Sequence, residues 1–190
     1  MQNLQVPSIM QRTESGQQAA EFGAALVILV VCIFLPLIDL AIIPIRYGLA
    51  QSLVGNYVRS LSLSENASQA FEKVEKDEEF RNQLIRIGGV QPKSIQLQIV
   101  STSSQGDGAQ SVCEKPKGFP AEWLPDGSNC PCTYSLDLKV VCAIEPVVLL
   151  KVGGGEIPGL NAPFTVTLLG QSQWENLGRD PVSSEFYINE

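Results

Sequence analysis

Cysteines are the side chains of this 190-residue sequence whose type and spacing most directly suggest chemistry. Four of the five lie in its polar part, at Cys113, Cys130, Cys132 and Cys142, whereas Cys32 lies inside a hydrophobic run. An even number outside that run favours disulfide bonds in an oxidising compartment. A single residue between Cys130 and Cys132 is too few for a zinc-binding or thioredoxin-like motif, so we expect no metal site.

Catalysis finds little support in the remaining residues. The chain contains no histidine, which removes Ser-His-Asp and Cys-His nucleophile systems together with His-ligated zinc sites. Acidic side chains are isolated, with no acid, base and nucleophile at a readable spacing. The net charge of −7 argues against a nucleic-acid partner, which requires a basic surface. We therefore expect a protein that is not an enzyme and binds no cofactor, metal or nucleic acid.

Two residues near the N-terminus stand at a distinctive spacing. Gly16 precedes Gln17, and Glu21 follows five positions after the glycine, directly before Phe22. Considered alone, Glu21 is explained as an acidic residue in the first turn of a membrane helix, where the helix dipole favours negative charge. A carboxylate within a membrane segment is costly, however, and usually has a partner.

The segment that carries Glu21 is long enough to cross a bilayer. Phe22–Ile38 contains no charged residue, and a membrane span needs roughly 20 apolar residues. This run is too long for the hydrophobic region of a secretory signal peptide, so we expect it to remain as an anchor. Pro36 and Pro44 should kink the helix without ending it. Beyond the anchor, one apolar stripe is predicted to pack on the rest of the protein, through Leu49, Leu53, Tyr57 and Leu61.

The remainder predicts a second helix followed by antiparallel strands. Ser64 is the expected N-cap of that helix, and Gly88–Gly89 is its expected end. Residues 102–133 show no period and predict a long loop. The fold class is therefore α+β: a long N-terminal hydrophobic helix and a second helix packed on a small antiparallel sheet of three to four strands. The expected strands are the segments with period two, at residues 95–99, 134–144 and 164–174.

The sequence Gly16-Gln17-Gln18-Ala19-Ala20-Glu21-Phe22 resembles the processing site of type IV prepilins. It is most similar to the tight-adherence (Tad, or Flp) branch, in which a prepilin peptidase cuts after the glycine and leaves the glutamate fifth in the mature chain. The resemblance implies cleavage between Gly16 and Gln17. It also implies that Glu21 and Phe22 set the register between subunits, with Glu21 paired to the N-terminal amine of a neighbouring subunit.

The rest of the chain is similar to the TadE-like minor pseudopilins of the same system. Asp39 and then Arg46 resemble the acidic and basic residues that end the hydrophobic head. The resemblance implies a leader at 1–16, a transmembrane or pilin-core helix at 17–46 and an extracytoplasmic α+β domain at 47–190. Expected partners are other pilin subunits, prepilin peptidase, the inner-membrane pilus assembly machinery and the lipid bilayer. The expected location is the cytoplasmic membrane, single-pass with the C-terminal domain outside, or an extracellular pilus.

Strand geometry limits the disulfide pairings. If residues 134–144 form one straight strand, Cys142 lies about 26 Å from its start. Cys130 and Cys132 come directly before that strand, so neither can approach Cys142 within the roughly 7 Å between Cα atoms that a disulfide requires. Pairing Cys142 with Cys113 would leave Cys130 and Cys132 to bridge across one proline, a strained ring. We therefore favour Cys113 paired with Cys130 or Cys132, a loop closure contributing about 3 kcal/mol, and Cys142 as a buried thiol.

A second class of function remains open. The chain would then be a single-pass, membrane-anchored binding protein whose outer domain recognises a partner through the 102–133 loop. The N-terminus of the mature protein separates the two, because a membrane receptor keeps Met1 and a pilin begins at Gln17.

Overall fold

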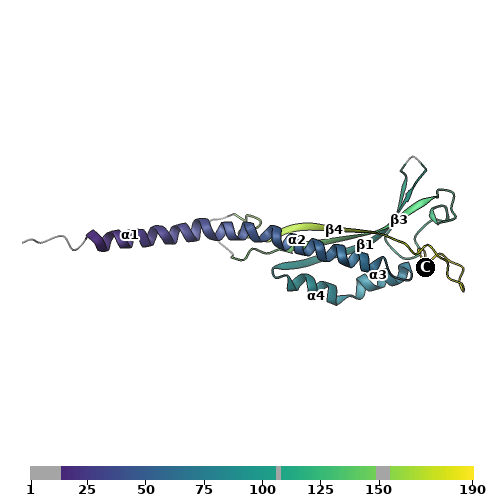
Figure 1. Cartoon of the computed structure of the whole chain (residues 1–190), viewed down its shortest axis with the longest axis horizontal. Coiled ribbons are helices and arrows are strands. Elements are labelled where there is room, and N and C mark those ends of the chain that lie inside the picture. Colours follow the sequence, from purple (N-terminus) through teal and green to yellow (C-terminus); the bar gives the residue numbers. More distant parts are fainter. Residues whose placement is uncertain (1–13, 106–107, 149–154) are drawn as a thin grey trace, which may run out of the picture.

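The structure, a computed structural model, describes residues 14–105, 108–148 and 155–190. One long helix projects from a small domain of helices and an antiparallel sheet (Figure 1), which confirms the predicted α+β class. Along the chain the elements are α1 (Glu14–Leu29), a π-helical turn (Val30–Phe34), α2 (Leu35–Leu61), α3 (Ala67–Lys76), α4 (Glu78–Arg86), β1 (Val90–Ser103), β2 (Gln110–Cys113), a 3-10 turn (Ala121–Trp123), β3 (Cys132–Ile144) and β4 (Phe164–Gln173).

The long helix continues through both of its prolines, as the sequence predicts. Pro36 stands at the start of α2, directly after the π-helical turn. Proline has no N–H to donate to the preceding turn, and a locally wider turn accommodates the lost bond. Pro44 lies inside α2 without ending it.

The four strands lie in the order β2-β1-β3-β4, all antiparallel. β1 and β3 form the long central pair, with Val90 opposite Ile144 at one end and Ser103 opposite Cys132 at the other. The alternation predicted for β3 is confirmed, because one face of the strand is fully buried. Its core-facing residues are Leu136, Leu138, Val140, Cys142 and Ile144.

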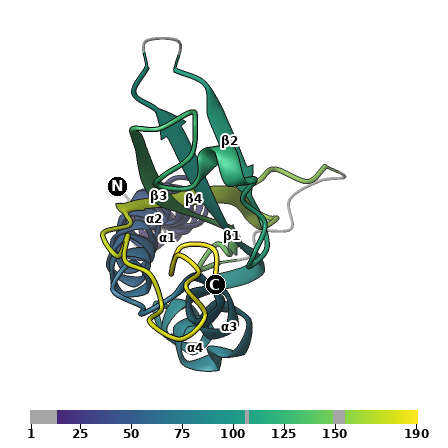
Figure 2. The same ribbon diagram turned by 90° about the vertical axis from the view of Figure 1, so that its right-hand side faces the viewer.

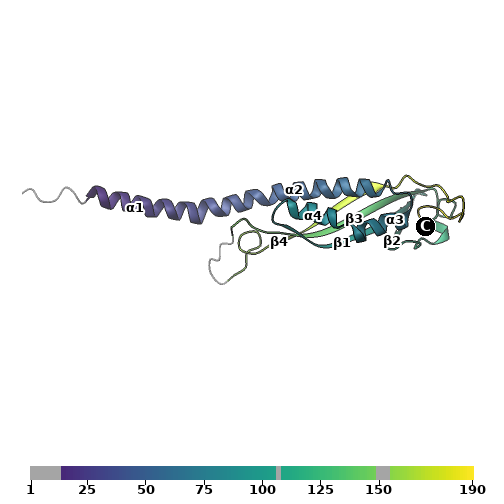
Figure 3. The ribbon, with the colours of Figure 1, turned by 90° about the horizontal axis from the view of Figure 1, so that it is seen from below.

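All the helices of the domain cover the same face of the sheet, as the end-on and lower views show (Figures 2 and 3). α2 packs on β3 and β4, and α3 and α4 pack on β1. The opposite face is lined by polar and exposed residues such as Lys139 and Gln171. A sheet with one buried and one solvated face gives the clean period-two pattern seen in the sequence.

The predicted apolar stripe on α2 is confirmed at Leu61 and wrong at Leu49, which is 55% exposed. Leu53 and Tyr57 are partly buried against the core. The fully buried residues of this part of the helix are Ala50, Val54, Val58 and Leu61. The smaller side chains face the sheet because β4 approaches closely at Gly170. A Cβ atom at position 170 would lie 3.0 Å from the Cγ1 atoms of both Val54 and Val58, so large side chains would not fit there.

The predicted second helix is two helices, and its cap is not Ser64. Asn66 caps α3, its side chain accepting from the Gln69 N–H at 2.9 Å. Asp77 caps α4 by accepting from the Phe80 N–H at 3.0 Å. Asn and Asp are as good N-caps as Ser, so residue type alone did not locate the starts. Gly88, with φ of 81°, follows α4 in a left-handed conformation that glycine adopts without strain.

The segment expected to be a loop, residues 102–133, contains structure. β2 pairs with the outer edge of β1, from Thr102 opposite Gln110 to Ile99 opposite Cys113. The strand is four residues long, too short to show a period.

The C-terminal tail packs over the start of α3 and the segment after β2. The N–H groups of Ala67 and Ser68 donate to the main-chain oxygens of Tyr187 and Glu190, at 2.8 and 3.1 Å. These bonds satisfy two donors that a helix N-terminus leaves unpaired. The ring of Phe186 is buried. Arg179 makes two further tail contacts: its guanidinium lies 4.0 Å from the Phe186 ring centroid and forms an ion pair with Asp126. Asn189 accepts from the Phe119 N–H at 3.1 Å.

Candidate functional site

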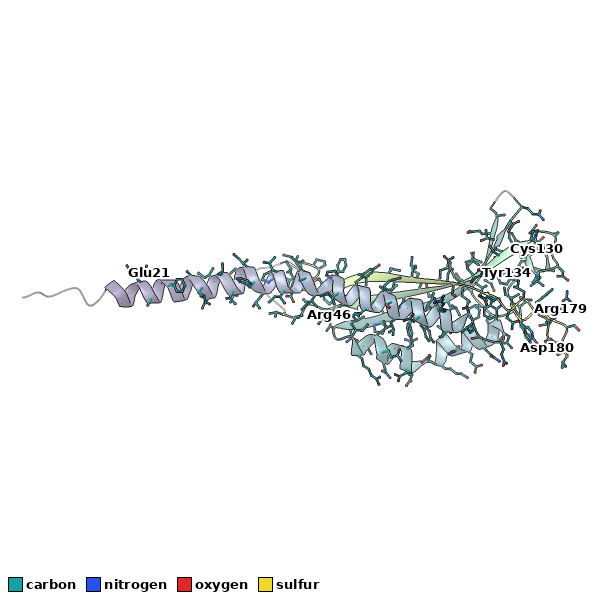
Figure 4. The ribbon with its side chains drawn as sticks, viewed as in Figure 1. Glu21, Arg46, Cys130, Tyr134, Arg179 and Asp180 are labelled. Carbon is teal, nitrogen blue, oxygen red and sulfur yellow. The ribbon has the colours of Figure 1, made fainter. Side chains whose placement is uncertain are left out.

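The residues of the processing motif lie on the projecting part of the long helix. Gly16 and Gln17 lie in α1, and the structure describes only the backbone of these two residues. Glu21 and Phe22 follow in the same helix; Glu21 is exposed to the surroundings, and Phe22 is 70% exposed (Figure 4). The motif therefore lies on the helix that projects from the folded domain.

The projecting helix presents an apolar surface on all sides. Residues 18–61 form a helix long and apolar enough to cross a membrane. Large hydrophobic side chains are open along it, including Ile28 at 62% and Leu37 at 55% exposure. A surface this large is not left bare in water and marks contact with lipid or with protein.

Asp39 joins this helix to the segment that follows β3. Its carboxylate is 1% exposed, and Oδ1 accepts from the N–H groups of Val147 and Val148 at 2.7 and 3.2 Å. Hydrogen bonds to a charged acceptor are stronger than neutral ones. The carboxylate thereby satisfies two main-chain donors of a connection that would otherwise lie unpaired against an apolar helix.

Arg46 makes the second attachment, two turns further along the helix. Its guanidinium donates to the Glu145 carbonyl oxygen and packs over Gly89, where a Cβ would lie 2.5 Å from a guanidinium nitrogen. The Glu145 N–H in turn donates to the Gly89 oxygen at 2.7 Å. Arg46 therefore binds the base of the β1–β3 pair to the helix. Glycine suits position 89 because its φ is 69°, a left-handed conformation.

Asp39 and Arg46 thus share one structural task, which sequence reasoning could not assign to them. Both bind the chain next to the end of β3, at Val147–Val148 and at Glu145. Arg46 lies where the helix meets the sheet (Figure 4). Because the two contacts lie on successive turns of one helix, they hold the sheet against the helix at this junction.

The cysteines are all free thiols in the structure, and the favoured pairing of Cys113 is not formed. Cys113 lies opposite Ile99 on one edge of β1, whereas Cys132 lies opposite Ser103 on the other edge. Four residues along β1 correspond to about 13 Å, and the two flanking strands are roughly 9–10 Å apart. This separation exceeds the roughly 7 Å between Cα atoms that a disulfide permits. The pairing of Cys113 with Cys132 therefore does not fit this sheet, whereas its pairing with Cys130 stays a prediction. No pattern in the sequence shows that β2 pairs with β1 away from Cys132.

Cys130 and Cys132 are the two cysteines that the structure brings together. Their sulfur atoms lie 2.6 Å apart at the end of the sheet opposite the Arg46 junction. Burial raises the pKa of the Cys132 thiol, and the neighbouring Cys130 raises it further. Cys142 is confirmed as a buried thiol, and burial raises its pKa to about 11.

A groove of about 600 Å³ lies between α3 and β1. Its lining mixes apolar and charged side chains, among them Phe71, Glu75, Arg81 and Ile95. Within the described parts of the chain, no three His, Cys, Asp or Glu side chains come together as metal ligands. The projecting helix offers an apolar contact surface, and Asp39 and Arg46 attach it to the sheet. The groove between α3 and β1 has no cysteine or histidine in its lining.

No protein-family model, no curated protein and no solved structure matches this chain.

Proposed function

We propose that the chain is a membrane-anchored, pilin-like subunit, similar to the TadE-like minor pseudopilins, that serves assembly or tip structure of a Tad-type pilus. The observation that carries the proposal is that the two parts of one helix differ in burial. Its first part, residues 18–34, is mostly apolar and uncovered, and its last part, through Val54 and Leu61, is buried against one face of a sheet. Such a helix can join a bilayer or a helical bundle without disturbing the domain it carries.

The position of the processing motif supports the same proposal. Gly16 lies in helical backbone just ahead of the apolar span, and Glu21 and Phe22 lie within the first turns of that span. Cleavage after Gly16 would place Glu21 within the first turns of the mature helix. A carboxylate there would pair with the N-terminal amine of an adjoining subunit and fix the axial register, since an unpaired charge in lipid is costly.

The proposed role is structural. Partners would be other pilin subunits, a prepilin peptidase, the assembly machinery of the inner membrane and the bilayer itself. The N-terminus would lie in the cytoplasm and the domain outside. A reporter enzyme fused after Glu190 and active only in an oxidising compartment should therefore be active, and activity of a cytoplasmic reporter at that position would reverse the topology.

N-terminal sequencing and intact mass of the protein from its own host test the proposal directly. We expect the mature chain to begin at Gln17, and Gly16→Arg to accumulate uncut because the peptidase site no longer admits the backbone. Gly23→Ala is the matched control, since nothing lies within 4 Å of a Cβ at that position, and it should be cut normally. A mature protein that keeps residues 1–16 would instead support the single-pass binding protein with an outer recognition loop.

A further inference from the structure

The thiols of Cys130 and Cys132 face each other across one exposed residue, Pro131. The two sulfur atoms are 2.6 Å apart, and a disulfide bond is about 2.05 Å long. We propose that Cys130 and Cys132 are a redox pair that closes to a disulfide by exchange with an external disulfide and reopens with an external thiol. The partner is a small or thioredoxin-type dithiol–disulfide couple, and the inference stands independently of the pilin proposal.

The surroundings hold the two sulfur atoms toward each other. The Cys130 thiol donates to the Leu124 oxygen at 2.9 Å, and the Cys132 thiol donates to the Asn129 oxygen at 3.4 Å. The hydroxyl of Tyr134 lies 3.4 Å from the Cys130 sulfur and donates to the Trp123 oxygen at 2.9 Å. Main-chain and tyrosine contacts from both sides therefore position the pair.

Hydrogen bonds from the end of β1 and the residues after it also hold the backbone around the pair. Ser103 donates through its hydroxyl to the Asn129 oxygen at 2.8 Å, and the Gln105 amide donates to the Cys130 oxygen at 2.6 Å. The pair is thus held in place while both cysteines remain half-buried and Pro131 is exposed. An external reagent can reach such a site without unfolding the domain.

The other cysteines lie too far away to compete. Cys142 is ten positions along the straight strand β3 from Cys132, a distance of about 33 Å. Cys113 lies in β2, on the opposite side of β1 from β3, and Cys32 lies in the apolar helix. Cys130 and Cys132 are the pair whose sulfur atoms are in contact, so we expect oxidation within one molecule to join these two.

The exchange balances in two steps. The thiolate of one cysteine attacks a sulfur of the external disulfide, forming a mixed disulfide and releasing one external thiol. The second cysteine then attacks the sulfur of the first, forming the Cys130–Cys132 bond and releasing the second external thiol. The cysteines lose two electrons and two protons, and the external disulfide gains both to become two thiols.

The closed ring is small, and this favours reversibility. It encloses a single residue between the two cysteines, so it constrains the unfolded chain far less than the long loops of structural disulfides. Small and exposed disulfides are the ones that exchange readily with surrounding thiols. The pair is accordingly suited to responding to its redox surroundings.

The test uses the purified full-length chain in detergent, equilibrated across mixtures of reduced and oxidised glutathione. After alkylation, intact mass and peptide mapping count the thiols. We expect two of the five thiols to disappear together, with an unalkylated mass about 2 Da lower because two hydrogen atoms leave. Mapping should place the bond between Cys130 and Cys132, and reductant should restore both thiols.

Cysteine variants distinguish the proposed redox pair from accidental oxidation. Cys130→Ser should trap a stable glutathione adduct on Cys132, since the resolving thiol is gone, whereas the double variant C113S/C142S should close the pair as the natural chain does. A natural chain that keeps five alkylatable thiols in oxidised glutathione, or that links Cys113 to either cysteine, would overturn the proposal. Because the mapping is done on the natural chain, the result does not depend on a variant folding.

Discussion

Adding a side chain at Gly170 should push the long helix off the sheet. A Cβ there would lie 3.0 Å from the Cγ1 atoms of Val54 and Val58 and 3.1 Å from the Val54 oxygen. Ordinary carbon contacts are about 3.5–4.0 Å, so even one added carbon is roughly 0.5–1 Å too close. In Gly170→Val two further methyl groups extend the clash, and we expect a loss of about 2–3 kcal/mol in the free energy of unfolding.

Thermal unfolding of the detergent-solubilised chain, followed by the fluorescence of buried Trp174, measures this effect. A loss of that size should lower Tm by roughly 4–12 °C in a chain of this length. Gly55→Ala, which lies in α2 itself, is the matched control. Nothing lies within 4 Å of a Cβ at Gly55, and alanine should stabilise the helix interior by about 0.5–1 kcal/mol.

A double-mutant cycle identifies the cause. Val54→Ala removes methyl groups that the new side chain would strike, so Gly170→Val should cost less in that background, with a coupling energy of at least about 0.5 kcal/mol. An unchanged or raised Tm for Gly170→Val, or strict additivity with Val54→Ala, would refute the placement of α2 over β4.

Three further predictions follow from local contacts. Asn66→Ala and Asp77→Ala should each cost about 1 kcal/mol by removing a helix cap, while Ser64→Ala stays within about 0.5 kcal/mol; equal losses in denaturant midpoints would contradict the cap assignments. Burial raises the pKa of Cys142 from 9.0 to about 11, so its alkylation at pH 8 should be about 100-fold slower than that of an open thiol. The folded state then binds more protons than the unfolded state between pH 9 and 11, and stability contributed by this thiol should fall as the pH rises through that window; alkylation at the rate of an open thiol would show the strand face to be exposed. Arg179→Ala removes a cation–π contact and an exposed ion pair, worth about 1 kcal/mol together, and should speed proteolysis of the tail; unchanged cleavage would mean the tail is held by its main-chain bonds alone.

Features with a strong period could be predicted from the sequence. The apolar segment can be recognised from its length alone. The alternation from Leu136 to Ile144 predicts both a strand and its buried face. The free Cys142 thiol followed from the same alternation. These features depend on the chain's own neighbours along a strand or helix, which the sequence displays directly.

Features that depend on distant partners could not be predicted. Leu49 and Ala50 are both compatible with a buried stripe, and only the close approach at Gly170 decides between them. β2 is too short to show a period, so the position of Cys113 relative to Cys130 was hidden. Asp39 looked like a mark of the hydrophobic head, but its partners are main-chain N–H groups about 108 positions away, which no local pattern reveals.

The packing of α2 on β4 has a consequence for the order in which the molecule can be made. Gln51 donates to the Leu169 oxygen at 2.7 Å across 118 positions of sequence. At roughly 5–20 residues per second, a ribosome needs about 6–24 s to make the intervening chain. Throughout that time Val54 and Val58 lack the β4 strand that packs against them at Gly170. The apolar helix is therefore synthesised long before the domain can close, and completion of the domain waits until the last strand is released.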